Sequence, residues 1–214
     1  MKNTNKDTED TKKIIATTKR KLVAQMKHLL LPLGFVQTKN AFWNRFTETM
    51  RHSFEFRQLR DNFDMRYGYM ILDKYGKYFD DNPNEYAYSY LYEKRWNLPD
   101  RMEEVEILAN ELMDYINEGL HYFERHGDPS QLVLDYEKGK IDKAYFASSP
   151  GWQEYRIGIA YHDIDRLPEA IQYFQEVIDK WSDENIPFIL TRKKMAERWI
   201  SDIEKKMKPA GNQS

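Results

Sequence analysis

The sequence predicts an α+β fold: an antiparallel sheet of four to five strands, packed by two long helices and followed by an all-α C-terminal extension. Three observations carry this prediction. Apolar residues recur every three or four positions in residues 14–33 and 100–126, which is typical of amphipathic helices. Between these segments, aromatic and polar residues alternate, which is typical of strands. Beyond residue 151 only the helical period remains.

The N-terminal region is expected to form a tail and then a helix. Residues 1–10 contain no apolar residue after Met1, so a disordered tail is expected there. From Ile14 the apolar positions keep helical spacing as far as Leu33. Pro32 and Gly34 then provide a stop signal.

Four strands are predicted from period-two alternation. The first two run through Phe42–Phe46 and Ser53–Arg57, and the third runs through Phe63–Ile71. The turn signal Asp61–Asn62 joins the second and third strands as an antiparallel hairpin. A fourth strand is expected through residues 86–92, where tyrosines occupy every second position.

The helical pattern returns after Pro99. Asp100 and Glu103 resemble a capping box at the start of a helix over residues 100–126. A short helix is expected after Pro129, and Gly139 is suited to end it.

We place a domain boundary at Ser148–Gly151. This gives a disordered tail over 1–10, an α+β domain over 11–147 and a helical extension over 148–214. Helices are expected over roughly 151–164, 168–181 and 187–207. Pro168 and Pro187 stand at the starts of the last two, where a first helical turn tolerates proline.

Residues from 14 to about 140 resemble a bacterial domain-of-unknown-function family, number 4304. The shared features are the helix ending Leu33-Gly34-Phe35, the strand start Phe42–Arg45, the strand running from Tyr86 to Trp96, the helix end Gly119–Glu124 and the short helix opened by Asp128-Pro129-Ser130. The resemblance implies an α+β fold and carries no activity with it.

Residues 151–182 are similar to one tetratricopeptide-type helical hairpin. Gly158, Tyr161, Ala170 and Phe174 stand at the spacings of that repeat. The small residues Gly158 and Ala170 would allow two helices to approach closely. The hairpin would either form a peptide-binding groove or act as a cap that completes the fold, and we favour the cap.

Composition excludes several classes of site. The chain has no cysteine, so disulfides, thiolate metal sites and cysteine nucleophiles are impossible. The N-terminus lacks the apolar core of a secretory signal, and the longest apolar run, Leu29–Leu33, is far below the ~20 residues of a membrane span. We therefore expect a cytoplasmic protein with no membrane partner.

No catalytic constellation emerges from the spacing of residues. Of the five histidines, His121 and His126 lie five residues apart and so on different faces of a helix, whereas a metal-binding pair on a helix is four residues apart. Phosphate-binding loops, nucleophile elbows and zinc-protease motifs are absent. We expect no catalytic residue, no metal ligand and no cofactor, although an enzyme of unknown class stays open.

Charge is unevenly distributed although the formal net charge is only −2. Eight cations and no acid lie between Thr11 and Thr47, whereas acids dominate residues 100–137. A nucleic-acid partner for the basic helix is one interpretation. The other, which we favour, is that the two helices share a sheet face and attract each other, or that each simply faces water.

Tyrosines are dense between residues 67 and 92, and a tyrosine ladder could form an exposed binding platform or be covered as core. We predict a non-catalytic protein-interaction or ligand-binding protein, with nucleic-acid binding through the basic helix as the alternative. The candidate binding surface comprises Tyr86, Tyr88, Tyr90, Tyr92, Arg57, Arg66, Tyr155 and Tyr161.

Overall fold

A computed structural model describes residues 4–38, 42–59, 62–75, 89–147, 151–182 and 186–208. It contains one five-stranded antiparallel sheet with strand order β1-β2-β3-β4-β5, and it has an α+β fold with C-terminal helices, as the sequence predicts. The strands are β1 (Val36–Thr38), β2 (Phe42–Phe46), β3 (Met50–Gln58), β4 (Asn62–Ile71) and β5 (Ser89–Asn97). The helices are α1 (Thr4–Leu30), η1 (Leu31–Leu33), α3 (Met102–His126), α4 (Pro129–Glu137), η2 (Lys143–Tyr145), α5 (Trp152–Asp163), α6 (Leu167–Lys180) and α7 (Pro187–Met207).

The described residues fall into two compact units. The first, here called the sheet unit, comprises Met1–Phe46, His52–Gly68 and Tyr90–Glu124. The second, here called the helical unit, comprises Thr47–Arg51, Tyr69–Ser89 and Arg125–Ser214.

Helix α1 is longer than the sequence predicts. It begins at Thr4, so residues 4–10 are helical where a disordered tail is expected. Residues 2–13 contain neither proline nor glycine, so nothing in this stretch breaks the helix. The predicted stop is confirmed, because Gly34 adopts a φ of 81° and its N–H bonds to the carbonyl of Leu31.

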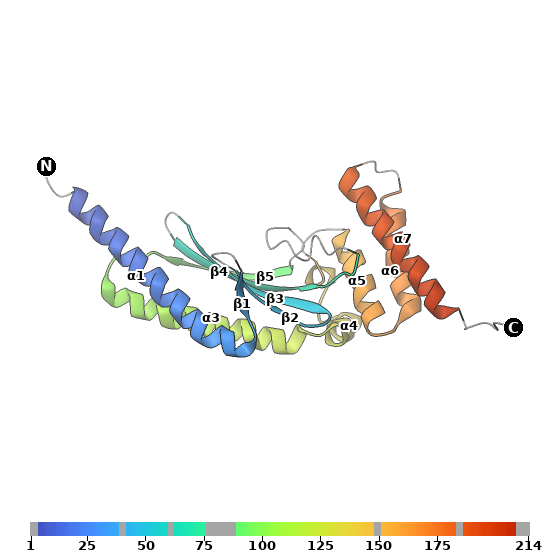
Figure 1. Cartoon of the computed structure of the whole chain (residues 1–214), viewed down its shortest axis with the longest axis horizontal. Helices are drawn as coiled ribbons and strands as arrows, with labels where there is room; N and C mark the ends of the chain where they lie inside the picture. Colours follow the sequence, from blue (N-terminus) through green and yellow to red (C-terminus); the bar gives the residue numbers. More distant parts are fainter. Residues whose placement is uncertain are drawn as a thin grey trace. The chain divides into compact units, whose positions relative to one another are not determined.

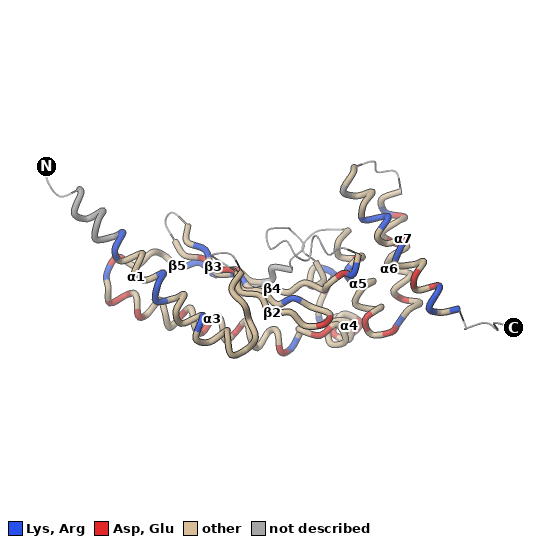
Figure 2. Tube along the Cα trace, in the orientation of Figure 1, with Lys and Arg blue, Asp and Glu red and all other residues tan. Residues whose placement is uncertain are grey.

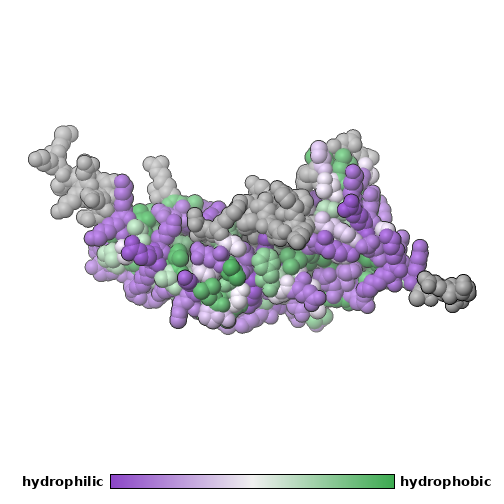
Figure 3. Space-filling view, viewed as in Figure 1, coloured by the Kyte–Doolittle hydropathy of each residue, from purple (hydrophilic) through white to green (hydrophobic). Residues whose placement is uncertain are grey.

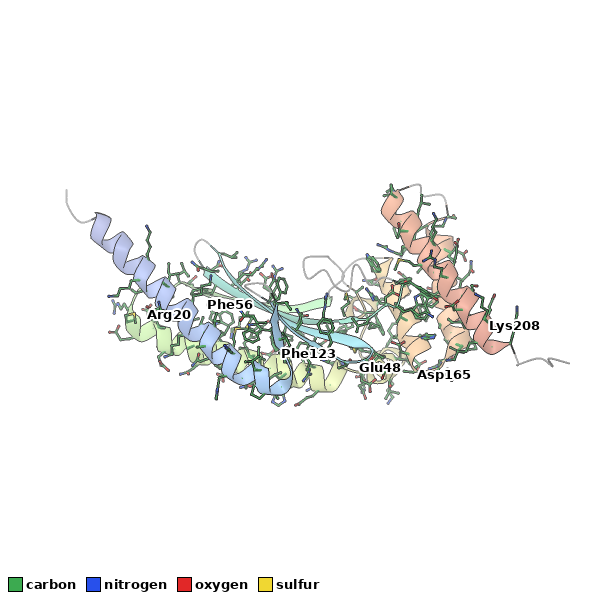
Figure 4. The ribbon with its side chains drawn as sticks, in the orientation of Figure 1. Arg20, Glu48, Phe56, Phe123, Asp165 and Lys208 are labelled. Atoms are coloured by element: carbon green, nitrogen blue, oxygen red, sulfur yellow. The ribbon has the colours of Figure 1, made fainter. Side chains whose placement is uncertain are left out.

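The sheet unit has two layers. Helices α1 and α3 lie on the same face of the sheet (Figure 1). Leu22, Met26 and Leu30 repeat every four residues along α1 and are fully buried, which is the inward stripe expected of an amphipathic helix. From α3, Phe123 lies between the helix and the strands (Figure 4), with its ring 5.3 Å from that of Phe54.

The sequence identified most strands correctly, with two differences. The hairpin between β3 and β4 is confirmed by a hydrogen bond from the N–H of Leu59 to the carbonyl of Asn62. Strand β1, which pairs antiparallel with β2, has only three residues and was too short for alternation to reveal it. The last strand begins at Ser89, and the expected strand residues 86–88 lie outside the described residues.

The start of α3 differs from the predicted capping box by one residue. The carboxylate of Glu104, not that of Glu103, accepts hydrogen bonds from the backbone N–H groups of Asp100 and Arg101. Both glutamates lie in the first helical turn, where a carboxylate satisfies otherwise unpaired N–H groups. The prediction that Glu103 is the capping residue is therefore wrong, and Glu104 takes that place.

The helical unit contains α5, α6 and α7 close to their predicted bounds. Gly158 permits a close approach of α5 to α6, since a Cβ atom there would lie 2.9 Å from the ring of Phe174. The ring of Phe174 in turn stacks on Trp199 of α7, with centroids 5.6 Å apart. The short helix α4 also forms as predicted, and Gly139 follows it with a φ of 67°.

Candidate binding surface at the sheet edge

Strand β5 forms one edge of the sheet, because its only neighbour in the strand order is β4. Among the described residues, no strand pairs with its outer side. Four consecutive residues of β5, Tyr92 to Arg95, are exposed. The opposite edge is formed by β1, which is much shorter. An exposed edge strand presents unpaired backbone N–H and C=O groups that can accept another strand.

The side of β5 that faces the helices is aromatic. Tyr92 is 38% exposed and stacks on Tyr67, with ring centroids 5.1 Å apart. It also makes an edge-to-face contact with Tyr122 of α3, with ring centroids 5.5 Å apart. Two positions on, Lys94 lies on the same side, and Trp96 completes the series with its ring 5.7 Å from Tyr115. Of the predicted tyrosine ladder, the structure describes the side chain of Tyr92 alone, which is in contact with α3 on one side and exposed on the other.

Burial affects the tyrosines beneath this edge. It raises the pKa of Tyr67, and the negative charge of Glu118 acts in the same direction. Burial likewise raises the pKa of Tyr115, again reinforced by Glu118. Both hydroxyls therefore stay protonated at neutral pH, and that of Tyr67 donates to Glu118 at 3.3 Å.

The other side of the sheet edge carries a ladder of alternating charges across three strands. Arg57 of β3 donates to both carboxylate oxygens of Asp64 in β4, at 2.8 and 2.5 Å. The hydrogen bond to Asp64 raises the pKa of Arg57. In the next step of the ladder, the guanidinium of Arg66 forms an ion pair with the carboxylate of Glu93 in β5, with nitrogen and oxygen 2.5 Å apart. Glu93 also forms an ion pair with Arg95. The charges of this face are thus satisfied within the sheet.

A cavity of about 220 Å³ lies where β5 ends and α3 begins. It is lined by Trp96, Asn97, Leu98, Pro99, Glu104, Ile107, Leu108 and Glu111. The lining residues of α3 recur at intervals of three and four and so share one helix face. One carboxylate oxygen of Glu111 accepts a hydrogen bond from the indole N–H of Trp96 at 3.0 Å.

The candidate residues from the sequence separate into three groups. Tyr92 lies on the exposed edge, and Arg57 and Arg66 belong to the charge ladder beside it. Tyr86 and Tyr88 lie outside the described residues, and Tyr90 lies in β5 with its side chain undescribed. The third group is the tyrosine pair of α5, treated next.

The expectation of an open groove around Tyr155 and Tyr161 is wrong, because both side chains are buried. The hydroxyl of Tyr155 donates to the buried carboxylate of Asp73 at 2.7 Å. Tyr161 stacks on Tyr173 with centroids 5.4 Å apart, and its hydroxyl donates to Glu137 at 3.1 Å. Burial and the hydrogen bond to Glu137 raise the pKa of Tyr161 to about 12. These tyrosines are core residues of the helical unit.

The charge segregation seen in the sequence continues in the structure. Figure 2 shows cations along α1 and acids along α3. One ion pair, between Lys21 and Glu106, links the two helices directly. This pair supports attraction between neighbouring helices. Other cations of α1 are exposed, among them Lys12, Lys13, Lys19, Arg20 and Lys27. Nucleic-acid binding through this helix stays a prediction.

The histidines occupy different environments. His52 lies in β3, is buried, stacks on Phe123 with ring centroids 4.8 Å apart and accepts a hydrogen bond from Arg45. His126 is also buried, with its Nδ1 3.8 Å from a carboxylate oxygen of Asp135. Neither histidine lines the cavity at β5. Within the described ranges, no group of three His, Asp or Glu side chains is placed to hold a metal ion.

We expect the buried imidazole of His126 to make the free energy of unfolding depend on pH. Burial lowers its pKa below the ordinary value, and Arg125 and Lys140 add to this effect, although Asp135 opposes it. Because the folded state favours neutral imidazole, its stabilising contribution is complete above about pH 6.5 and is lost as the pH falls. We expect the free energy of unfolding to fall more steeply from pH 7 to pH 5 in the unmodified protein than in His126→Gln. Urea titrations at a series of pH values measure this.

The matched control for the His126→Gln variant is His121→Gln. His121 lies on the same helix, and its side chain is 74% exposed. We expect it to retain the pH dependence of the unmodified protein. Equal slopes for all three proteins would show that His126 does not titrate differently in the folded and unfolded states.

Comparison of the chain with known protein families, curated proteins and solved structures finds no match. The resemblances to family 4304 and to the tetratricopeptide hairpin therefore stay predictions. No helix in the described part of the chain combines the length and apolar character needed to cross a membrane. On the face shown in Figure 3, hydrophilic residues cover most of the described surface, and apolar residues form small groups.

Proposed function

We propose that this chain is a non-catalytic interaction protein that binds an extended segment of a partner protein along the outer edge of β5. The main support for this proposal is that residues Tyr92 to Arg95 are exposed on a nine-residue edge strand. Adding a strand to such an edge is a recurrent mode of peptide recognition, in which backbone hydrogen bonds give affinity and side-chain contacts give specificity.

The side chains of β5 support this mode of binding. Both carboxylate oxygens of Glu93 are already engaged, one by Arg66 and the other by Arg95, so the strand does not present an unpaired acid to an incoming backbone. Tyr92 supplies a half-exposed aromatic surface held in place by Tyr67 and Tyr122. Tyrosines of this kind are enriched at protein interfaces.

Consecutive proline substitutions at Lys94 and Arg95 test the edge directly. Successive residues of a strand direct their N–H groups to opposite edges, so one proline removes an outward N–H and the other removes an N–H that faces β4. We expect one variant to keep its melting temperature but bind peptides about ten-fold more weakly, which is a loss of ~1.4 kcal/mol. The other variant should lose stability. The ligands are linear peptides selected from a random phage-displayed library on the full chain.

Lys94→Ala and Arg95→Ala serve as matched controls, because they remove the same side chains and keep the backbone N–H groups. We expect both to bind the selected peptides within about two-fold of the unmodified protein, as is usual for exposed side chains. Unchanged binding in the stable proline variant, or no peptide enriched over an uncoated surface, would refute the proposal.

A further inference from the structure

The cavity at the end of β5 is not used by backbone pairing along the strand. Its lining begins at Trp96 and Asn97, the last two residues of β5, and continues onto the first turns of α3. A segment paired with β5 and extending past Asn97 would bring a side chain to this cavity. We infer that the cavity is a specificity subsite for an arginine or lysine side chain of the bound segment. This role rests on the proposed function, whereas the chemistry of the cavity does not.

The size of the cavity fits one side chain. Its volume of about 220 Å³ is below the ~300–1,000 Å³ typical of sites for whole small-molecule ligands. Its walls include the ring of Trp96 and the apolar side chains of Pro99, Ile107 and Leu108. Ile107 is 60% exposed although it lies on a helix with a well-formed buried stripe. Such walls suit the methylene stem of a long basic side chain.

The charge of the cavity favours a cation. Among the described residues, the charged side chains that line it are those of Glu104 and Glu111. Hydrogen bonds hold both carboxylates in position: backbone N–H groups at Asp100 and Arg101 bond to Glu104, and the indole of Trp96 bonds to Glu111. A carboxylate can accept about four hydrogen bonds. Each therefore has capacity for an incoming ammonium or guanidinium group.

The chain already places one cation beside the aromatic wall of the cavity. The ammonium of Lys94 lies 5.3 Å from the centroid of the Trp96 ring and 5.8 Å from that of Tyr115. Tryptophan is the aromatic ring most favourable to cations. Lys94 is not among the described residues that line the cavity, so the carboxylates of Glu104 and Glu111, and not Lys94, determine the charge on the cavity wall.

Titration with capped single amino acids tests the cavity without any strand addition. The probes are Nα-acetyl-arginine amide and Nα-acetyl-norleucine amide, added to the full chain labelled with ¹⁵N. The readout is the shift of the indole N–H resonance of Trp96, assigned by its loss in Trp96→Phe. We expect the arginine probe to produce a saturable shift and the norleucine probe to bind at least about five-fold more weakly, because it lacks the charge.

Glu111→Gln and Glu103→Gln form a matched pair, since both remove one negative charge from α3 but only Glu111 lines the cavity. Glutamine can still accept the indole hydrogen bond. We expect Glu111→Gln to weaken binding of the arginine probe about five-fold and Glu103→Gln less than about two-fold, as for an exposed charge. Equal binding of the two probes, equal effects of the two substitutions, or no shift of the Trp96 resonance would overturn the inference. These results are independent of the proline variants, so failure of the cavity and failure of the edge can be distinguished.

Discussion

Replacing Asp73 with alanine is expected to lower the free energy of unfolding by about 3 kcal/mol, because the buried hydroxyl of Tyr155 loses its acceptor and the indole of Trp199 loses one of its two. The carboxylate of Asp73 is 3% exposed and accepts hydrogen bonds from the hydroxyl of Tyr155 at 2.7 Å and from the indole N–H of Trp199 at 3.2 Å. It also accepts from the backbone N–H of Tyr75. Urea unfolding followed by tryptophan fluorescence measures the loss.

The expected loss of stability is large because Asp73 links side chains that are far apart in the sequence. Tyr155 is 82 positions away in the chain and Trp199 is 126 away. Burial raises the pKa of Tyr155, and the negative charge of Asp73 raises it further. The tyrosine therefore remains a hydrogen-bond donor at neutral pH. Trp199 also donates to the hydroxyl oxygen of Tyr155 at 3.1 Å, so the three side chains form one closed hydrogen-bond network. Removing one member of such a network lowers the free energy of unfolding by more than the loss of a single hydrogen bond does.

Two further substitutions distinguish the contribution of this hydrogen-bond network from the effect of removing any aspartate. Asp73→Asn keeps one acceptor oxygen and the shape of the side chain, and we expect it to cost less than the alanine variant by at least about 1 kcal/mol. Asp179→Ala removes an exposed carboxylate from α6 and should change stability by less than about 0.5 kcal/mol. A cost for Asp73→Ala no larger than that of Asp179→Ala would contradict the argument.

Local patterns predicted the secondary structure well where they were long enough to repeat. Helix α3 shows its period over 25 residues, so the pattern predicts it, whereas β1 has three residues and the pattern gives no sign of it. The predicted tyrosine pair of α5 shows a different limit. Tyr92 and Tyr155 are the same residue type in strongly periodic segments, yet one is half-exposed and the other is fully buried. The difference depends on Asp73, Phe174 and Trp199, which are distant in sequence.

The cavity at β5 illustrates the same limit for a binding site. It forms only because the end of β5 and the first turns of α3 come together, and no motif marks its lining. One sequence signal does point toward it. Ile107 falls outside the apolar stripe formed by Val105, Leu108 and Leu112, so it is an apolar residue on the exposed side of a helix. That signal indicates a contact surface without indicating what faces it.

Replacing Gly119 with alanine is expected to destabilise the protein by about 2 kcal/mol, although alanine is the better helix former by ~1 kcal/mol. Gly119 lies in α3 where the helix crosses the aromatic face of the sheet. A Cβ atom at this position would lie 2.6 Å from a ring carbon of Phe54 and 2.9 Å from the ring of Tyr67. Both rings are at most 1% exposed, so neither can move aside into solvent. The measurement is the urea midpoint of the full chain.

The control for this prediction uses the same helix and the same new residue. Asn117→Ala adds no bulk at an exposed position and should leave stability unchanged or slightly increased, because alanine favours the helix. If overpacking is the cause, Phe54→Leu should cost less in the Gly119→Ala background than alone, since the smaller side chain relieves the clash. Such coupling would locate the strain at the contact between α3 and β3. A Gly119→Ala protein as stable as the unmodified one would mean that the helix can move away from the sheet at no cost, which the close packing of interiors argues against.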